Sequence, residues 1–210
     1  MPRRIVVGVS GASGSPYLLR LLRILAESGV EIHLAVSELG KRLLVEELRI
    51  TSVSALHLGI PEFEQQLIVY NNKDLGASIA SGTFLHDGMI VLPCSSNTLG
   101  AIASGITTNL VQRAAAVTLK ERRQLILAHR ETPVGLIDIR NMCTVTEAGG
   151  VIAPLSPGFY MLPESIEDMV DFMVGKLLDL LGVQHTMPVR WNSKTNEPNL
   201  YQRPFCKSCT

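Results

Sequence analysis

The sequence has no excess of charge of either sign. Its 19 lysine and arginine residues balance 19 aspartate and glutamate residues, so the formal net charge is zero. Without a basic surplus, the chain as a whole does not favour DNA, RNA or an anionic membrane as a partner. Any recognition of a phosphate group must therefore depend on a local arrangement of residues.

The chain also lacks a long hydrophobic run and has little cysteine. No segment approaches the roughly 20 consecutive apolar residues that a membrane-crossing helix needs, and the N-terminus does not resemble a signal peptide. The cysteines are Cys94, Cys143, Cys206 and Cys209. They are too few and too scattered for a disulfide framework, and the single C-x-x-C pair lacks the second ligand pair of a typical zinc site. We therefore expect a cytoplasmic protein.

What the sequence does contain is an alternation of short β-branched runs and helical patterns. Strands are expected at residues 5–9, 31–36, 89–92, 125–128 and 151–153, and helices at residues 16–28, 37–49, 98–104, 110–122 and 164–181. Residues 51–82 have no regular pattern. Most of these strands are apolar throughout, as in a parallel sheet covered on both faces. The pattern predicts an α/β protein with a three-layer Rossmann-like (flavodoxin-like) domain and a mostly parallel sheet.

The domain organisation follows from length and composition. With 210 residues and 46% hydrophobic content, we expect a single domain over residues 1–192 and a polar tail over residues 193–210. The low net charge and apolar composition also favour a homo-oligomer.

The first expected loop at a carboxyl end of a strand is Ser10-Gly-Ala-Ser-Gly-Ser-Pro16. Its glycines let backbone N–H groups approach an anion, and its serines add hydroxyl donors at the start of a helix. The loop lacks the lysine of a P-loop, and the spacing of Gly8, Gly11 and Gly14 differs from the dinucleotide fingerprint. A mononucleotide therefore fits better than NAD or ATP. A simple Gly/Ser turn with a helix cap remains the alternative.

Further polar residues lie between the third and fourth of these strands. Ser95-Ser-Asn-Thr98 supplies hydroxyl and amide donors at the start of the next helix. Arg113 and Lys120 are seven residues apart, so they project from nearly the same helix face, beside three alanines. This face can hold an anion, or it can be a solvated basic surface.

The last polar cluster follows the strand ending near His129. Arg130 can clamp a phosphate through its planar guanidinium, and Glu131 can orient that arginine or exchange a proton. Tyr160 and Trp191 can wall off water and face a carbocation with their rings. Taken alone, each of these aromatic residues is more typical of packing.

Several ordered motifs carry a resemblance to a known family. They are Ser10-Gly-Ala-Ser-Gly14, Pro93-Cys-Ser-Ser-Asn-Thr98, Asn109-Leu-Val-Gln-Arg-Ala114, Leu119-Lys-Glu-Arg-Arg123, Arg130-Glu131, Pro157-Gly-Phe-Tyr160 and Arg190-Trp191. In this order they resemble the UbiX-type flavin prenyltransferases, formerly called aromatic acid decarboxylases. The resemblance spans about residues 3 to 192.

The resemblance implies a Rossmann-like flavoprotein that binds reduced FMN as a prenyl acceptor. The donor would be dimethylallyl monophosphate, with bonds forming at flavin N5 and then C6. The product, prenylated FMN, would serve a UbiD-type decarboxylase. Members of the family are typically homododecamers with sites at subunit contacts.

The resemblance also implies roles for individual residues. FMN would be held by Gly11, Ala12, Ser13, Ser37, Ser95, Ser96, Thr98 and Arg113. The allylic phosphate and the prenyl group would be surrounded by Lys120, Arg130, Glu131, Tyr160 and Trp191. Glu47 would join Ser13 in moving protons near the flavin. No metal is expected, because Asp168 and Asp171, the nearest candidates for a metal-bound diphosphate, are expected to face solvent.

Two alternatives remain open at this level. Pro93-Cys-Ser-Ser-Asn-Thr98 also resembles the flavin motif of a related FMN enzyme that decarboxylates a cysteine derivative, but of the Met-Asn-rich clamp of that enzyme only Asn141-Met142 is present. A non-catalytic flavin-carrier subunit of a decarboxylase would need the flavin loops without the cluster of charged residues.

Overall fold

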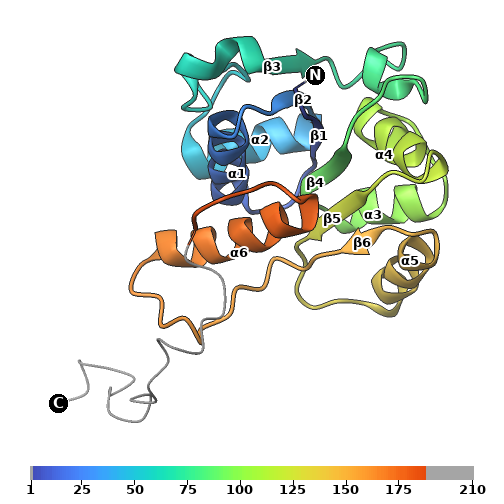
Figure 1. Cartoon of the computed structure of the whole chain (residues 1–210). Coiled ribbons are helices and arrows are strands. Elements are labelled where there is room, and N and C mark those ends of the chain that lie inside the picture. Colours follow the sequence, from blue (N-terminus) through green and yellow to red (C-terminus); the bar gives the residue numbers. More distant parts are fainter. Residues whose placement is uncertain (1, 188–210) are drawn as a thin grey trace.

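The computed structural model of the chain describes residues 2–187, which form one six-stranded sheet with helices on both faces (Figure 1). The strands are β1 (Arg4–Val9), β2 (Glu31–Val36), β3 (Leu67–Tyr70), β4 (Gly88–Cys94), β5 (Leu125–His129) and β6 (Val151–Ile152). The helices are α1 (Ser15–Glu27), α2 (Glu38–Leu48), α3 (Ser96–Ala103), α4 (Leu110–Lys120), α5 (Leu136–Glu147) and α6 (Ile166–Leu181). Short 3-10 helices are η1 (Pro61–Gln66) and η2 (Ser78–Ala80). The strands within these residues are all parallel, which confirms the predicted fold class.

Side chains of the central strands alternate between two apolar clusters, one on each face of the sheet. Val7 of β1 and Ile90 of β4 pack with α1 and α6, whereas Val6 and Val91 pack with α3, α4 and α5. Every residue of β4 is buried. Figure 1 shows the same division, with α1 and α6 on one side of the sheet and α3, α4 and α5 on the other. Burial on both faces explains why these strands are continuous apolar runs in the sequence.

In the strand order β3-β2-β1-β4-β5-β6, successive strands are added on one side of β1 as far as β3 and on its other side from β4 onward. At such a change of side the following loops leave toward opposite faces, which opens a crevice at the carboxyl ends of the strands. Here the two loops are tied together by Ser10. Its hydroxyl donates to the Pro93 carbonyl at 3.0 Å and accepts from the Ser95 N–H at 2.8 Å. Ser10 therefore holds the loops after β1 and β4 next to each other.

The sequence patterns miss two elements, β3 and α5. Strand β3 has only four residues, lies at the edge of the sheet and exposes Val69, so it is too short to show a periodic pattern. Helix α5 buries only Val145 and exposes Leu136, Ile137 and Ile139. It therefore lacks the apolar stripe by which amphipathic helices are recognised.

The predicted tail, residues 193–210, lies outside the described residues together with Arg190, Trp191 and the Cys206–Cys209 pair. Within residues 2–187, no helix is both long enough and apolar enough to cross a membrane.

Candidate active site

The loops that follow five of the strands carry the residues predicted for the site. These residues are Gly11, Ala12 and Ser13 after β1, Ser37 after β2, Ser95, Ser96 and Thr98 after β4, Arg130 and Glu131 after β5, and Tyr160 after β6. Because the strands are parallel, all these loops lie at the carboxyl edge of the sheet. This edge is the candidate active site.

Glu47, in the last turn of α2, reaches across to the loop after β1. Its carboxylate accepts hydrogen bonds from the Ser15 N–H at 2.8 Å and the Gly14 N–H at 3.2 Å. Burial by itself raises the pKa of this carboxyl, but hydrogen bonds from Ser15, Ser13 and Gly14 outweigh burial and bring the pKa below its usual range. Glu47 is therefore ionised at neutral pH.

The position of Glu47 changes what the loop can bind. The N–H groups of Gly14 and Ser15 lie at the N-terminus of α1, where the helix dipole favours an anion. In this chain that anion is the Glu47 carboxylate. A phosphate at this edge therefore has to be held by donors other than these two N–H groups.

A substitution at Gly14 tests how tightly this loop is built. Gly14 has φ of 136°, and an added Cβ would lie 3.3 Å from the side chains of Leu155 and Tyr17. We expect Gly14→Ala to lower the free energy of unfolding by about 1–3 kcal/mol, because an L side chain is strained at this φ. Urea denaturation measures this loss. The control is Gly59→Ala, at φ of 75° with nothing within 4 Å. Equal losses at both positions would show that the neighbours of Gly14 add nothing.

Two further helix N-termini point at the same edge. Ser37 caps α2 by accepting from the Gly40 N–H at 3.0 Å, and Ser95 caps α3 by accepting from the Thr98 N–H at 3.3 Å. Ser95 also donates to the Thr98 hydroxyl at 3.1 Å. Helix N-termini with hydroxyl donors are well suited to a phosphate. With no lysine in these loops, the donor set fits the phosphate of a mononucleotide such as FMN.

The backbone at Gly11 is packed closely against α2. A Cβ built on Gly11 would lie only 2.5 Å from the Cβ of Leu39. Only glycine allows this approach between the loop after β1 and the first turn of α2. The close approach brings the donors of Ser37 next to those of the loop after β1.

Arg130, Glu131 and Tyr160 lie on the β6 side of this edge. The Arg130 N–H donates to the Cys94 carbonyl at 3.1 Å, which joins the loop after β5 to that after β4. The side chains of Arg130 and Glu131 are exposed. The Tyr160 ring packs edge-on against Phe172 of α6, with ring centroids 5.5 Å apart. The Arg130–Glu131 pair thus follows β5 next to the end of β4, whereas Tyr160 lies against α6.

Arg113 and Lys120 are not brought together at this edge within one chain. Helix α4 begins beside Asn72, beyond the carboxyl end of β3, where the Leu110 N–H donates to the Asn72 carbonyl. It ends at Lys120, just before β5 begins. Arg113 therefore lies in the first turn, donating to the Ala80 carbonyl at 3.2 Å. Lys120 lies at the opposite, amino edge and pairs with Glu121.

The distance between Lys120 and Arg130 follows from the strand between them. The five residues of β5 span about 16 Å, and Lys120 precedes the strand while Arg130 follows it. Because the Lys120 side chain pairs with Glu121 at the amino edge, one small phosphate at the carboxyl edge does not contact both side chains of the same chain in this arrangement. If both residues act on one substrate, a second copy of the chain must supply one of them.

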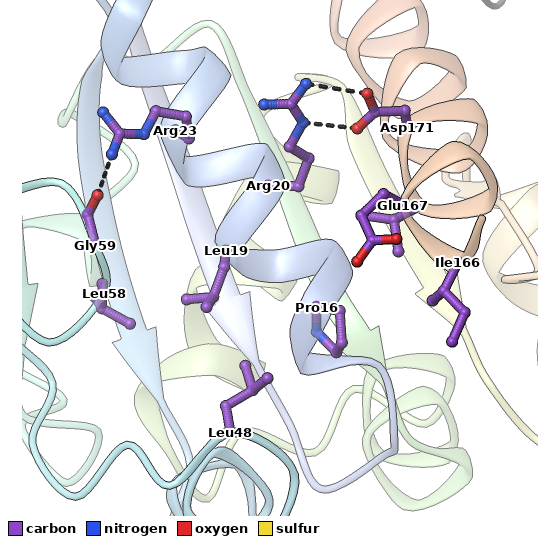
Figure 2. Close-up of a pocket in the computed structure, with 11 residues that line it drawn as sticks. Pro16, Leu19, Arg20, Arg23, Leu48, Leu58, Gly59, Ile166, Glu167 and Asp171 are labelled. Atoms are coloured by element: carbon purple, nitrogen blue, oxygen red, sulfur yellow. Dashed lines mark hydrogen bonds and ion pairs between the residues drawn. The ribbon is translucent and has the colours of Figure 1, made fainter.

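A separate pocket of about 650 Å³ lies on the outer side of α1, between α6 and the segment at Leu58 and Gly59 (Figure 2). Its arginines have partners. Arg20 makes a bidentate ion pair with Asp171 at 2.6 and 3.0 Å, and Arg23 donates to the Gly59 carbonyl, as the dashed lines in Figure 2 show. Apart from Pro16, in the first turn of α1, its lining includes no residue of the loops of the candidate active site.

The Asp168–Asp171 pair, the nearest candidate for a metal-bound diphosphate, has structural partners. Asp168 accepts from the N–H groups of Glu164 and Ser165 at the start of α6. Asp171 is half-buried and paired with Arg20, whereas we expected it to face solvent. Among residues 2–187, no three His, Cys, Asp or Glu side chains are grouped to hold a metal ion.

Three histidines give a prediction for pH dependence. Burial lowers the pKa of His33, His86 and His129 below the ordinary 6.5. The unfolded chain then binds protons more readily than the folded chain, so stability is complete above the ordinary pKa and declines as pH falls through it. We expect the free energy of unfolding to fall between about pH 7 and pH 5, measured by urea denaturation. His33→Gln should reduce this slope, and a profile that is flat over this range would contradict the prediction.

Known proteins that match this chain identify its family. The Flavoprotein family model matches residues 1–178. A flavin prenyltransferase UbiX from Thermoplasma acidophilum is 45% identical over 190 residues, covering 90% of this chain and 99% of that protein. The chain belongs to the UbiX-type flavin prenyltransferases. This confirms the resemblance found in the sequence motifs.

Solved structures of UbiX-type proteins agree with this membership. AnUbiX (PadA1), in complex with FMN and dimethylallyl pyrophosphate, is 41% identical, with a TM-score of 0.80 over 91% of this chain and 98% of that chain. A dodecameric FMN-dependent UbiX-like decarboxylase from Escherichia coli O157:H7 is 38% identical, with a TM-score of 0.81 over 90% of this chain and 99% of that chain. Cysteine-type decarboxylases match at 20% identity or less, which shows the fold alone.

Two contacts at the candidate active site were not visible in the sequence. The sequence motifs do not reveal that Glu47 occupies the N-terminus of α1, because a contact 33 residues apart leaves no local pattern. Nor do they reveal that His129 contacts Ser96, since these two residues are also 33 positions apart in the sequence.

Proposed function

We propose that the protein binds reduced FMN and transfers the dimethylallyl group of dimethylallyl monophosphate to N5 and C6 of the flavin. The prenylated FMN would serve a UbiD-type decarboxylase, and we place the protein in the cytoplasm. The observation that carries this proposal is the exposed Arg130–Glu131 pair directly beside the hydroxyl-rich N-terminus of α3. The Arg130–Glu131 pair suits a leaving phosphate, and the N-terminus of α3 suits the phosphate of a mononucleotide.

The residues divide into two sets with different chemistry. FMN would be held by Gly11, Ala12, Ser13, Ser37, Ser95, Thr98 and Arg113, with Ser96 nearby. When bound, FMN supplies the nucleophilic ring positions that accept the prenyl group. Arg130 would bind the allylic phosphate, Glu131 would orient Arg130, and Tyr160 would donate a hydrogen bond to the phosphate.

The charge distribution suits cleavage of an allylic C–O bond. Negative charge grows on the phosphate and positive charge on the carbon as this bond breaks. Cationic side chains at the leaving group and aromatic rings around the carbon stabilise that separation, provided that water is excluded. Trp191, which lies outside the described residues, would cover the prenyl group. The ionised Glu47 would accept a proton near the flavin.

Lys120 would reach the site from a second copy of the chain. Within one chain it lies at the amino edge, a strand length away from Arg130. We therefore propose a homo-oligomer, with a dodecamer as the expected form, in which one subunit supplies Arg130 and another supplies Lys120. The catalytic site would be incomplete in a monomer.

The proposed activity is tested by anaerobic incubation with reduced FMN and dimethylallyl monophosphate, followed by mass analysis of the released flavin. A flavin heavier by one dimethylallyl group supports the proposal, and an unchanged mass contradicts it. A parallel sample with a chelator should give the same product, since no metal is expected. Dimethylallyl diphosphate in a third sample tests the preference for one phosphate.

The flavin-carrier alternative predicts a different result. A carrier would bind FMN and activate a partner decarboxylase without Lys120 or Tyr160. If Lys120→Ala and Tyr160→Phe both kept full activation of the partner, the carrier function would replace the proposed transfer.

A further inference from the structure

His129 has no role in the function proposed above, yet it is one of the few buried polar side chains at the carboxyl edge. It is the last residue of β5, directly before Arg130, and only 2% of it is exposed. Its Nε2 lies 3.1 Å from the hydroxyl of Ser96, the first residue of α3. A buried imidazole therefore links the loop of the phosphate clamp to the helix of the flavin site.

The direction of the hydrogen bonds around Ser96 is determined by Asp138 in the first turn of α5. The Asp138 carboxyl is hydrogen-bonded to the Ser96 side chain, and this bond lowers its pKa. A carboxylate can only accept, so the Ser96 hydroxyl donates to Asp138. The Ser96 oxygen is then free to accept the proton on His129 Nε2. His129 thus donates a hydrogen bond to Ser96, and Ser96 donates one to Asp138.

These hydrogen bonds join β5, α3 and α5, which carry His129, Ser96 and Asp138. Asp138 also accepts from the Gly135 N–H at 3.0 Å, which fixes the start of α5. Residues 130–137, between His129 and Asp138, are all exposed. Few packing contacts hold this segment, so hydrogen bonds at its two ends have a large share in its position.

We propose that His129, Ser96 and Asp138 are positioning residues that hold the Arg130–Glu131 segment against the N-terminus of α3, and thereby set the affinity for the allylic phosphate. The substrate in this statement rests on the proposed function. Ser96 then contributes through its contacts with His129 and Asp138, because its hydroxyl proton is committed to Asp138 and is not available to a phosphate.

Kinetics of matched variants test the proposal. His129→Leu removes the donor to Ser96, and Ser96→Ala removes the acceptor. At saturating reduced FMN, each should raise the KM for dimethylallyl monophosphate roughly tenfold, with kcat within about threefold, since a hydrogen bond of this kind contributes about 1.4 kcal/mol. His129→Gln, whose side-chain amide can still donate, should restore most of the affinity. The double variant should have the same KM as either single variant, because both substitutions remove the same hydrogen bond between His129 and Ser96.

His33→Leu is the structural control. His33 is also buried and makes two side-chain hydrogen bonds, to Glu31 and Tyr70 at 2.8 Å, but it lies in the first half of β2. Its loss should lower stability without changing the KM for dimethylallyl monophosphate. A KM that rises equally in His33→Leu and His129→Leu would overturn the positioning role, as would an unchanged KM in His129→Leu.

Hydrogen exchange gives a readout that needs no activity. In His129→Leu, the backbone amides of residues 130–136 other than Pro133 should exchange faster than in the wild-type protein, and His129→Gln should restore their protection. Unchanged exchange in His129→Leu would overturn the proposal. If the wild-type protein forms no prenylated flavin, the proposed function fails, and the exchange measurement alone decides the positioning role.

Discussion

Co-expressed Lys120→Ala and Arg130→Ala subunits are expected to regain about a quarter of the wild-type rate, because random assembly makes about one site in four from two intact contributions. Each variant alone should lose about 10²- to 10³-fold in kcat/KM, as expected when one charged contact to a developing anion is removed. Prenylated FMN, quantified by mass analysis, measures both effects. Lys176→Ala, an exposed lysine on α6, should leave the rate unchanged.

A second mixture distinguishes a site that is shared between two subunits from a site that lies within one subunit. Wild-type subunits co-expressed with a Lys120→Ala/Arg130→Ala double variant should also give about a quarter of the rate if the residues come from different subunits. If both residues acted within one chain, this mixture would give about half, and the first mixture would give almost nothing. The second pattern would contradict the placement of Lys120 inferred from α4 and β5.

Glu47→Gln is expected to lower prenyl transfer about 10²-fold, in the range found when a group that exchanges a proton is lost. The variant keeps the size of the side chain but removes its charge. The amide group would also direct N–H donors toward the N–H groups of Gly14 or Ser15, so one part-buried hydrogen bond is lost. We expect the free energy of unfolding to fall by about 1–3 kcal/mol in the same variant.

The neighbouring Glu46 provides a control for Glu47. It is exposed and pairs with Arg42 one turn away. Glu46→Gln should change stability by less than about 0.5 kcal/mol and leave transfer unaffected. Mass analysis and urea denaturation of both variants measure the difference. Full activity in Glu47→Gln would exclude the carboxylate from proton transfer and leave it as a helix cap.

The sequence predicted the elements whose signal is local. The strands around Val7 and Ile90 are apolar because both faces are buried, and the helices beginning near Ser95 and Ser165 carry capping residues. Strand β3 and helix α5 were not predicted, because neither has a clear periodic pattern of hydrophobic residues. Their existence depends on neighbours that pair with or cover them.

The class of fold, the family and the sheet edge of the candidate site can all be inferred from the sequence, because strand and loop motifs are contiguous in the chain. Which side chains meet depends on the tertiary structure. Glu47 at the α1 N-terminus, Lys120 at the amino edge and His129 against Ser96 all depend on the direction of a helix or strand relative to a distant segment. That direction is set by packing over the whole sheet, and no local pattern encodes it.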